Sequence, residues 1–67
     1  MSYRERLYKE YSEIDDRVFK LTQFAKEENP IFKQLDIDSK YLLLTQLKAM
    51  ETYKSILWLR LDQLSRN

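Results

Sequence analysis

The sequence contains no cysteine, no histidine and no glycine, and only one proline among its 67 residues. Without cysteine there is no disulfide framework and no thiolate nucleophile, and without histidine the usual general base and the usual zinc ligand are both missing. The lack of glycine removes phosphate-cradling glycine-rich loops and most tight hairpin turns. These absences exclude zinc fingers, redox motifs and Ser-His or Cys-His hydrolases, and they predict a chain that is nearly all helix.

Long hydrophobic runs and an excess of one charge are also missing. The longest apolar runs, residues 41–44 and 56–59, are four residues each, far shorter than the roughly 20 needed to span a bilayer. The 12 Lys and Arg nearly balance the 11 Asp and Glu, so the strongly basic face expected of a nucleic-acid-binding protein is absent. Residues 1–10 are rich in charge and no apolar segment follows, unlike a signal peptide. We therefore expect a cytoplasmic protein without a membrane or nucleic-acid partner.

A first helix is predicted over about residues 3–28. Ser2 precedes Glu5 by three residues, which is the capping-box arrangement at a helix start. Asn29 and Pro30 end the helix, because the residue before a proline is disfavoured in the helical conformation. Apolar residues recur at alternating spacings of four and three, which places them on one side of the helix: Leu7, Tyr11, Ile14, Val18, Leu21 and Ala25.

A turn over about residues 29–36 and a second helix over about residues 37–65 follow. Pro30 is expected to open one short helical turn, and Asp36 is the expected N-cap of the second helix. We expect Ile31, Phe32 and Leu35 to plug the end of the resulting hairpin. The second helix has its own stripe, interrupted by the polar Lys54: Leu43, Leu47, Met50, Lys54, Leu57, Leu61 and Leu64.

The chain has more apolar side chains than one hairpin can bury. A domain near 60 residues buries only about 60% of its surface and is marginal by itself, and here neither a disulfide nor a bound metal helps. The fold class predicted is therefore all-α, an antiparallel two-helix hairpin with a short helical turn, assembled into a homo-oligomeric bundle. The residues expected at the oligomer interface are Leu42, Leu44, Ile56, Trp58 and Leu59.

Groups suited to catalysis or metal binding are scarce. Asp15 and Asp16 are adjacent, so their side chains point about 100° apart on a helix, and Asp36 with Asp38 is better explained as helix capping. The acidic spacing lacks the glycine and distal glutamate of a calcium loop. No serine or threonine has a credible base in its sequence context. We expect no enzyme activity, no metal and no cofactor.

Ligand binding has more support from the sequence than catalysis or metal binding has. Aromatic residues make up 13% of the chain, and the stretch 40–60 carries four basic residues against one acidic residue. Aromatic planes stack on nucleobases while Arg and Lys bind phosphates, so a subunit boundary lined in this way could hold a small nucleotide. The simpler interpretation is that Tyr and Trp pack an interface with a polar atom at its edge. Lys54 is equally compatible with fixing the register of a bundle and with binding a ligand.

Several segments spread over almost the whole chain are distinctive: Ser2-Tyr-Arg-Glu-Arg-Leu7, Lys20-Leu21, Phe24, Pro30-Ile-Phe-Lys-Gln-Leu35-Asp36 and Leu42-Leu43-x-x-Gln46-x-x-Ala49-Met50-x-x-Tyr53-x-x-Ile56-Leu57-x-x-Arg60-Leu61. Through these segments the sequence resembles very small helical-hairpin proteins encoded by tailed phages and prophages. More distantly, the hairpin is similar to the helical domain of phage sponge proteins that counter CBASS and Thoeris immunity. Those proteins sequester cyclic oligonucleotide or cyclic ADP-ribose signals at subunit boundaries without cleaving them.

Two functional hypotheses follow from the residues and the resemblance. The first is a counter-defence protein that binds a nucleotide-derived immune signal between its own subunits. In this reading Tyr53 stacks on the base, Arg60 and Lys54 bind phosphate, Gln46 bonds the base edge, and Arg17 or Lys20 contributes from the first helix. The second is a protein-binding module that inhibits or adapts a host or phage protein through an apolar helix face.

Overall fold

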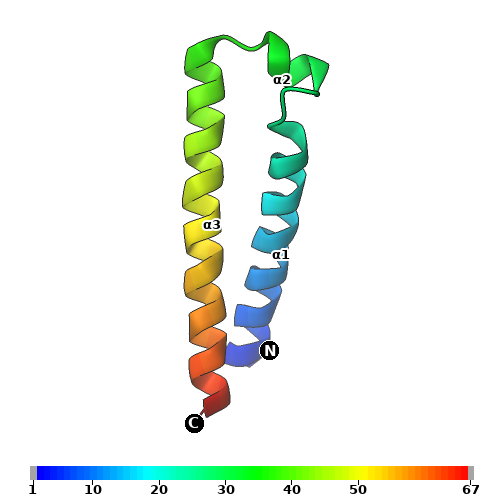
Figure 1. The fold of residues 1–67 in the computed structure, drawn as a ribbon. Coiled ribbons are helices and arrows are strands. Elements are labelled where there is room, and N and C mark those ends of the chain that lie inside the picture. The colour runs from blue at the N-terminus through cyan, green and yellow to red at the C-terminus, as the bar shows by residue number, and fades with distance from the viewer. Residues whose placement is uncertain (1, 67) are drawn as a thin grey trace.

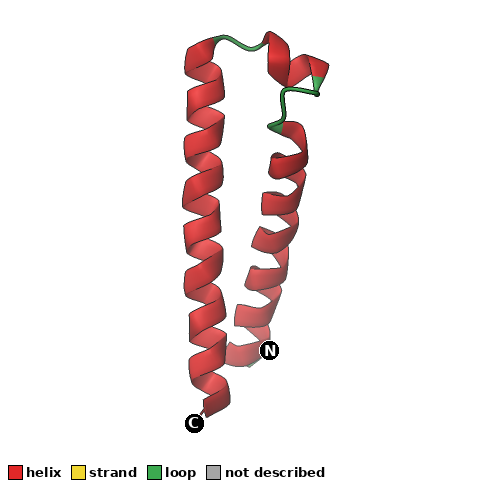
Figure 2. Cartoon of the chain, in the orientation of Figure 1, coloured by secondary structure: helices red, strands yellow, loops and turns green. Residues whose placement is uncertain are grey.

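The computed structural model, which describes residues 2–66, is a helical hairpin. Its elements are α1 (Tyr3–Phe24), α2 (Pro30–Gln34) and α3 (Ile37–Arg66). The long helices α1 and α3 run antiparallel, α2 lies in the connection between them, and both chain ends lie at the opposite end of the molecule (Figure 1). Every regular element in this range is helical (Figure 2). The predicted all-α hairpin with a short helical turn is therefore confirmed. The molecule is a rod about 48 Å long and 16 Å wide.

The start of α1 follows the predicted capping arrangement. Ser2 is the N-cap, and its hydroxyl accepts a hydrogen bond from the Glu5 backbone N–H at 3.1 Å. The same hydroxyl donates to the Glu5 carboxylate at 3.2 Å. These bonds satisfy one of the helix's unpaired backbone donors and keep negative charge at the positive end of the helix dipole.

The end of α1 differs from the prediction. The helix stops at Phe24, whereas the sequence places its end at about residue 28. The cause is the cap of the next helix: the Asn29 side chain accepts hydrogen bonds from the N–H groups of Ile31 and Phe32 at 2.9 and 3.1 Å. To aim its side chain along the axis of α2, Asn29 must be extended, so the residues before it form a non-helical turn rather than one more turn of α1.

The short helix α2 closes the end of the hairpin through one residue. Phe32 is buried and packs edge-on against Phe24, with ring centroids 6.0 Å apart and an interplanar angle of 84°. The Lys40 ammonium lies 5.5 Å from the centre of the Phe32 ring. Leu35 is half-buried, but Ile31 is 65% exposed. The prediction that Ile31 plugs the hairpin was wrong, because the α2 N-cap turns that side chain outward.

The start of α3 is held by Asp36. Its carboxylate accepts a hydrogen bond from the Ser39 backbone N–H at 3.0 Å. Hydrogen bonds from the Ser39 hydroxyl and then from its backbone N–H lower the pKa of Asp36 below its usual value. With no glycine or proline after this cap, α3 continues unbroken to Arg66.

The hydrophobic core is one thin stripe between α1 and α3. Leu7, Ile14 and Leu57 are buried, and the partly buried side chains packed against them also come from the two predicted stripes: Tyr11, Val18, Met50, Leu61 and Leu64. The chain exposes 5479 Å², whereas a globular monomer of its 8.3 kDa mass exposes about 4,600 Å². About 900 Å² of surface is therefore exposed beyond that expectation. A two-helix rod has no further element with which to cover it.

Candidate functional site

Polar and aromatic residues gather along both sides of the core stripe. On one side, which we call the Tyr53 flank, Tyr53 and Arg60 of α3 bond to residues of α1. On the other, the Trp58 flank, Lys54 and Trp58 of α3 contact α1. Neighbouring helix residues point about 100° apart, so Tyr53 and Lys54 project to opposite sides of the buried Leu57 row.

The Tyr53 flank contains a ladder of residues in antiparallel register. The Tyr53 hydroxyl donates a hydrogen bond to the Glu10 carboxylate, and the Arg60 guanidinium donates one to the Tyr3 hydroxyl. Both members of the second pair lie seven residues from those of the first, so both pairs lie on the same side of each helix. Continuing the spacing of seven reaches Arg17 on α1 and Gln46 on α3; the Gln46 amide nitrogen lies 3.8 Å from the Met50 sulfur. We call these six the ladder residues: Tyr3, Glu10, Arg17, Gln46, Tyr53 and Arg60.

The ladder residues supply two phenol rings, an amide, two positive charges and the Glu10 carboxylate. The Arg60 guanidinium carbon lies 5.6 Å from the centre of the Tyr3 ring, and the two residues border a depression of about 280 Å³ that Glu10 and Arg6 also line. None of the four ion pairs found in residues 2–66 includes Arg60. Its close hydrogen-bonding partner is the neutral Tyr3 hydroxyl, so the charge of Arg60 is available to an anion.

Tyr53 is held in its protonated form. The hydrogen bond to Glu10 raises the pKa of the Tyr53 phenol above its usual value of 10.0, because the bond exists only while the phenol keeps its proton. The nearby negative charge of Glu10 acts in the same direction. Tyr53 remains 39% exposed, so the bond orients the ring while leaving ring surface in contact with solvent.

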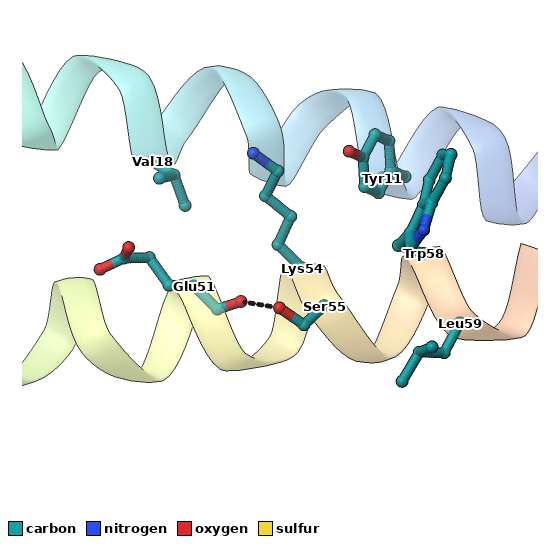
Figure 3. A pocket seen from close by; sticks show the side chains of 7 residues that line it. All are labelled: Tyr11, Val18, Glu51, Lys54, Ser55, Trp58 and Leu59. Atoms are coloured by element: carbon teal, nitrogen blue, oxygen red, sulfur yellow. Dashed lines mark hydrogen bonds between the residues drawn. The ribbon is translucent and has the colours of Figure 1, made fainter.

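The Trp58 flank has a larger depression but a neutralised cation. Lys54 pairs with Asp15 at 2.5 Å, and that bond raises the pKa of the Lys54 ammonium despite partial desolvation. The Tyr11 and Trp58 rings are 5.9 Å apart at their centres and inclined by 44°. The depression has a volume of about 480 Å³ and is drawn in Figure 3; its lining residues are Tyr11, Val18, Glu51, Lys54, Ser55, Trp58 and Leu59.

This depression is poorly suited to a phosphate. The ammonium of Lys54 extends from α3 toward α1 (Figure 3), where Asp15 compensates its charge. Glu51 adds a carboxylate to the lining, which opposes the approach of an anion. The Trp58 flank therefore offers aromatic surface with little net positive charge.

The structure separates the six residues predicted to bind a ligand. Gln46, Tyr53 and Arg60 fall in one row of α3, and the exposed Arg17 shares their flank through the ladder register. Lys54 lies on the opposite flank. Lys20 is exposed on α1 and pairs with Asp16 at 2.9 Å.

The five residues predicted at the oligomer interface are all exposed in the single chain. Their exposed fractions lie between 47% and 66%, and they divide between two sides of α3. Leu42 and Ile56 lie on the same side of α3 as Tyr53. Leu44, Trp58 and Leu59 lie on the other side and on the outer surface of the helix.

Three partners in these sites were missed by the sequence analysis. The sequence pairs none of Tyr3, Glu10 and Asp15 with a residue of the second helix. The spacing of seven from Tyr3 through Glu10 to Arg17 matches the spacing from Gln46 through Tyr53 to Arg60. That match is the sequence signal from which the ladder could have been found.

The structure defines a small all-helical hairpin with polar and aromatic residues along both sides of its core stripe. No three acidic side chains lie close enough to hold a metal ion in the part of the chain that the structure describes. No helix in residues 2–66 is both long and apolar enough to cross a membrane.

Comparison with known proteins then assigns the family. A sequence model described as Sequestin matches residues 1–63, so the chain belongs to the Sequestin family. The family name is consistent with a protein that acts by sequestering. No curated protein and no solved structure matches the chain.

Proposed function

We propose that this protein is a phage or prophage counter-defence protein that sequesters a negatively charged, base-containing immune signal. Cyclic oligonucleotides and cyclic ADP-ribose isomers are the ligand class. Binding without cleavage agrees with the sequestering role that the family name suggests, and the chain contains no histidine or cysteine. The protein acts as a homo-oligomer in the cytoplasm of the bacterial host.

The observation that carries this proposal is the ladder. Gln46, Tyr53 and Arg60 follow one another at intervals of seven, about 10 Å along the helix axis. A base stacks on Tyr53, the Arg60 guanidinium binds a phosphate, and the Gln46 amide bonds the base edge. Arg17 contributes a second positive charge from α1. This order of amide, aromatic ring and cation suits a ligand in which bases alternate with phosphates.

Two of the predicted cations are assigned a structural role instead. Lys54 forms a 2.5 Å ion pair with Asp15, and Lys20 pairs with Asp16 within α1. A phosphate would have to displace a carboxylate from each of them, which costs part of the binding energy. Arg17 and Arg60 have no ion-pair partner within residues 2–66, so they bind the anion in this proposal.

Subunit boundaries complete the site. An open depression of about 280 Å³ beside Arg60 covers one side of a nucleotide only, whereas small-ligand sites bury most of the ligand surface. The exposed Leu42 and Ile56 lie on the same flank as the ladder. A second copy that packs on these two residues would place its own surface over the ligand.

Ligand-dependent melting tests this proposal. A ligand that binds only the folded state at about 100 times its Kd stabilises that state by about 2.7 kcal/mol, which raises the Tm of a domain this small by roughly 10 °C or more. The expected result is a rise in Tm with at least one cyclic di- or trinucleotide or cyclic ADP-ribose isomer. Unchanged Tm across the whole panel, at concentrations far above micromolar, refutes sequestration of this ligand class.

A matched pair of arginine variants locates the site. Arg60→Gln removes the uncompensated charge. It should weaken the apparent affinity for the ligand at least tenfold, because a charge-assisted bond to phosphate is lost. The weaker binding is measured as a smaller ligand-induced rise in Tm. Arg66→Gln removes an arginine of the same helix that already pairs with Asp62 at 2.6 Å, and should leave ligand binding unchanged. Equal effects of the two substitutions would contradict the ladder as the binding surface.

A protein-binding module is the second candidate function. Tyr53, Ile56 and Trp58 are 39%, 48% and 57% exposed in the hairpin, and such apolar exposure favours a partner helix or groove. Light scattering together with Trp58 fluorescence separates the two candidates. A monomer with a solvent-exposed tryptophan favours the module acting on a host protein, while an assembly with a shielded tryptophan favours the sponge.

A further inference from the structure

The outer surface of α3, extending onto the Trp58 flank, has a second pattern that the ladder does not use. Six exposed residues recur at spacings of three, four, three, four and three, which places them on one side of the helix. We call them the outer seam: Tyr41, Leu44, Lys48, Glu51, Ser55 and Trp58. They lie away from Leu57, the fully buried residue of α3, and Glu51, Ser55 and Trp58 are seen along the helix in Figure 3.

The outer seam is self-complementary when read in the opposite direction. Its order of spacings is the same from either end, so two copies of α3 can pair antiparallel about a two-fold axis between Lys48 and Glu51. In that register Lys48 of each copy faces Glu51 of the other. A parallel pairing would instead bring like charges together.

The remaining pairs of this register are compatible with contact. Tyr41 of one copy faces Trp58 of the other, and Leu44 faces Ser55 beside the exposed Leu59. Aromatic pairs of this kind add to the energy of apolar burial. The pairing thus has aromatic contacts at its two ends and opposite charges at its centre.

The charges at the centre of the outer seam are unpaired within the hairpin. Neither Lys48 nor Glu51 takes part in any of the ion pairs of residues 2–66. The surface around them is hollowed: a depression of about 190 Å³ lies between Lys48, Glu51, Thr52 and Ser55. The larger depression beside Trp58 continues along the same helix. Hollows in a helix surface receive the side chains of a partner helix in knobs-into-holes packing.

The uncovered area is that of a dimer interface. The chain exposes about 900 Å² more than a globular monomer of its mass, and a standard interface buries about 800 Å² on each partner. We infer that the outer seam pairs with the outer seam of a second copy, antiparallel, to form a four-helix dimer. This inference rests on the self-association in the proposed function but makes no use of the ligand.

The inferred dimer leaves the ladder accessible. Tyr53 and Arg60 lie on the other flank of α3, together with Leu42 and Ile56. Two kinds of contact therefore follow: the outer seam joins copies into dimers, and the Leu42 and Ile56 surface joins dimers around the ligand.

Charge reversal tests the register without touching the ladder. Lys48→Glu or Glu51→Lys alone places like charges together at two positions of the symmetric dimer and should weaken dimerisation roughly tenfold or more. The double variant K48E/E51K restores opposite charges and should recover the wild-type Kd. Lys33→Glu on α2 is the control for a change of net charge and should leave the Kd unchanged. Sedimentation equilibrium gives the Kd, and circular dichroism checks that each variant is folded.

Cysteine cross-linking provides an independent measurement of the same register, because the natural chain has no cysteine. The double variant L44C/S55C brings the two thiols of opposite copies together and should form a disulfide-linked dimer. S55C alone leaves its thiols about 16 Å apart along the axis, beyond disulfide range, and should remain uncross-linked.

The results separate this inference from the proposed function. A monomeric wild-type chain, or a dimer insensitive to both charge reversals, overturns the outer seam as an interface. Loss of the ligand-induced rise in Tm in R60Q with dimerisation intact supports the two surfaces as distinct. Dimerisation through the outer seam with no response to any cyclic nucleotide would sustain this inference and refute the proposed ligand.

Discussion

Replacing Leu57 by alanine should remove a large part of the hairpin's stability. Leu57 is fully buried, with 0% of its surface exposed, and forms the core with Leu7 and Ile14. Leu→Ala changes at buried sites cost about 2–5 kcal/mol, and the lower half of that range applies where neighbours can close the cavity, as two unconstrained helices can. The better helix propensity of alanine returns only a few tenths of a kcal/mol. We expect a net loss of about 2–3 kcal/mol.

That loss is large for so short a chain. Stabilities near 0.05–0.15 kcal/mol per residue give about 3–10 kcal/mol for the folded protein, so Leu57→Ala should lower the Tm by roughly 10–20 °C. Urea unfolding followed by far-ultraviolet circular dichroism, at one protein concentration for all variants, measures the change in free energy.

An exposed isoleucine at the start of the same helix provides the control. Ile37 is 81% exposed, and Ile37→Ala should change the free energy of unfolding by no more than about 0.5 kcal/mol. The reasoning is refuted if the two variants lose equal stability. It is also refuted if Leu57→Ala costs less than about 1 kcal/mol, since the thin core stripe would then not hold the helices together.

Two further predictions concern pH and capping. The pKa values of Tyr53 and Lys54 are raised above 10.0 and 10.5, so the folded state holds these protons more tightly; their contribution to stability is complete below about pH 10 and is lost as pH rises through the raised values. As the pH rises through that range, the double variant Y53F/K54M should lose less unfolding free energy than the neighbouring control Y8F/K9M. Urea unfolding at several pH values measures this. Identical slopes of unfolding free energy against pH in the two variants would contradict the bonds of Tyr53 and Lys54. Asn29→Ala removes the cap of α2 and should cost about 1 kcal/mol of unfolding free energy, whereas Asn29→Asp keeps an acceptor and should cost much less. Equal urea midpoints for those two variants would show that the cap contributes nothing.

The elements of this fold were predictable from local sequence features. Ser2 and Asp36 act as helix caps as their positions indicate, and the spacing of apolar residues on each predicted helix contains the observed core. The end of α1 was predicted less well. Its position depends on the direction in which Asn29 must point to cap α2, which is a property of the turn in three dimensions.

The assignment of partners between the helices needed the structure. A turn of a dozen residues tolerates several registers between two amphipathic helices, since a shift by seven residues keeps both apolar stripes in contact. In the observed register Leu57 is buried between the long helices and Phe32 is buried at the closed end. That register makes Asp15 the partner of Lys54 and Glu10 the partner of Tyr53.

The amino-acid sequence by itself determined that the chain is helical, where its helices begin, and which side of each helix is apolar, because these properties depend on neighbours within a few residues. Only the tertiary structure decided which charges remain uncompensated. Lys54 and Arg60 are comparable cations in the sequence, but one lies beside a carboxylate of α1 and the other beside a phenol. The charge available to a ligand depends on that pairing across the hairpin, which no local pattern specifies.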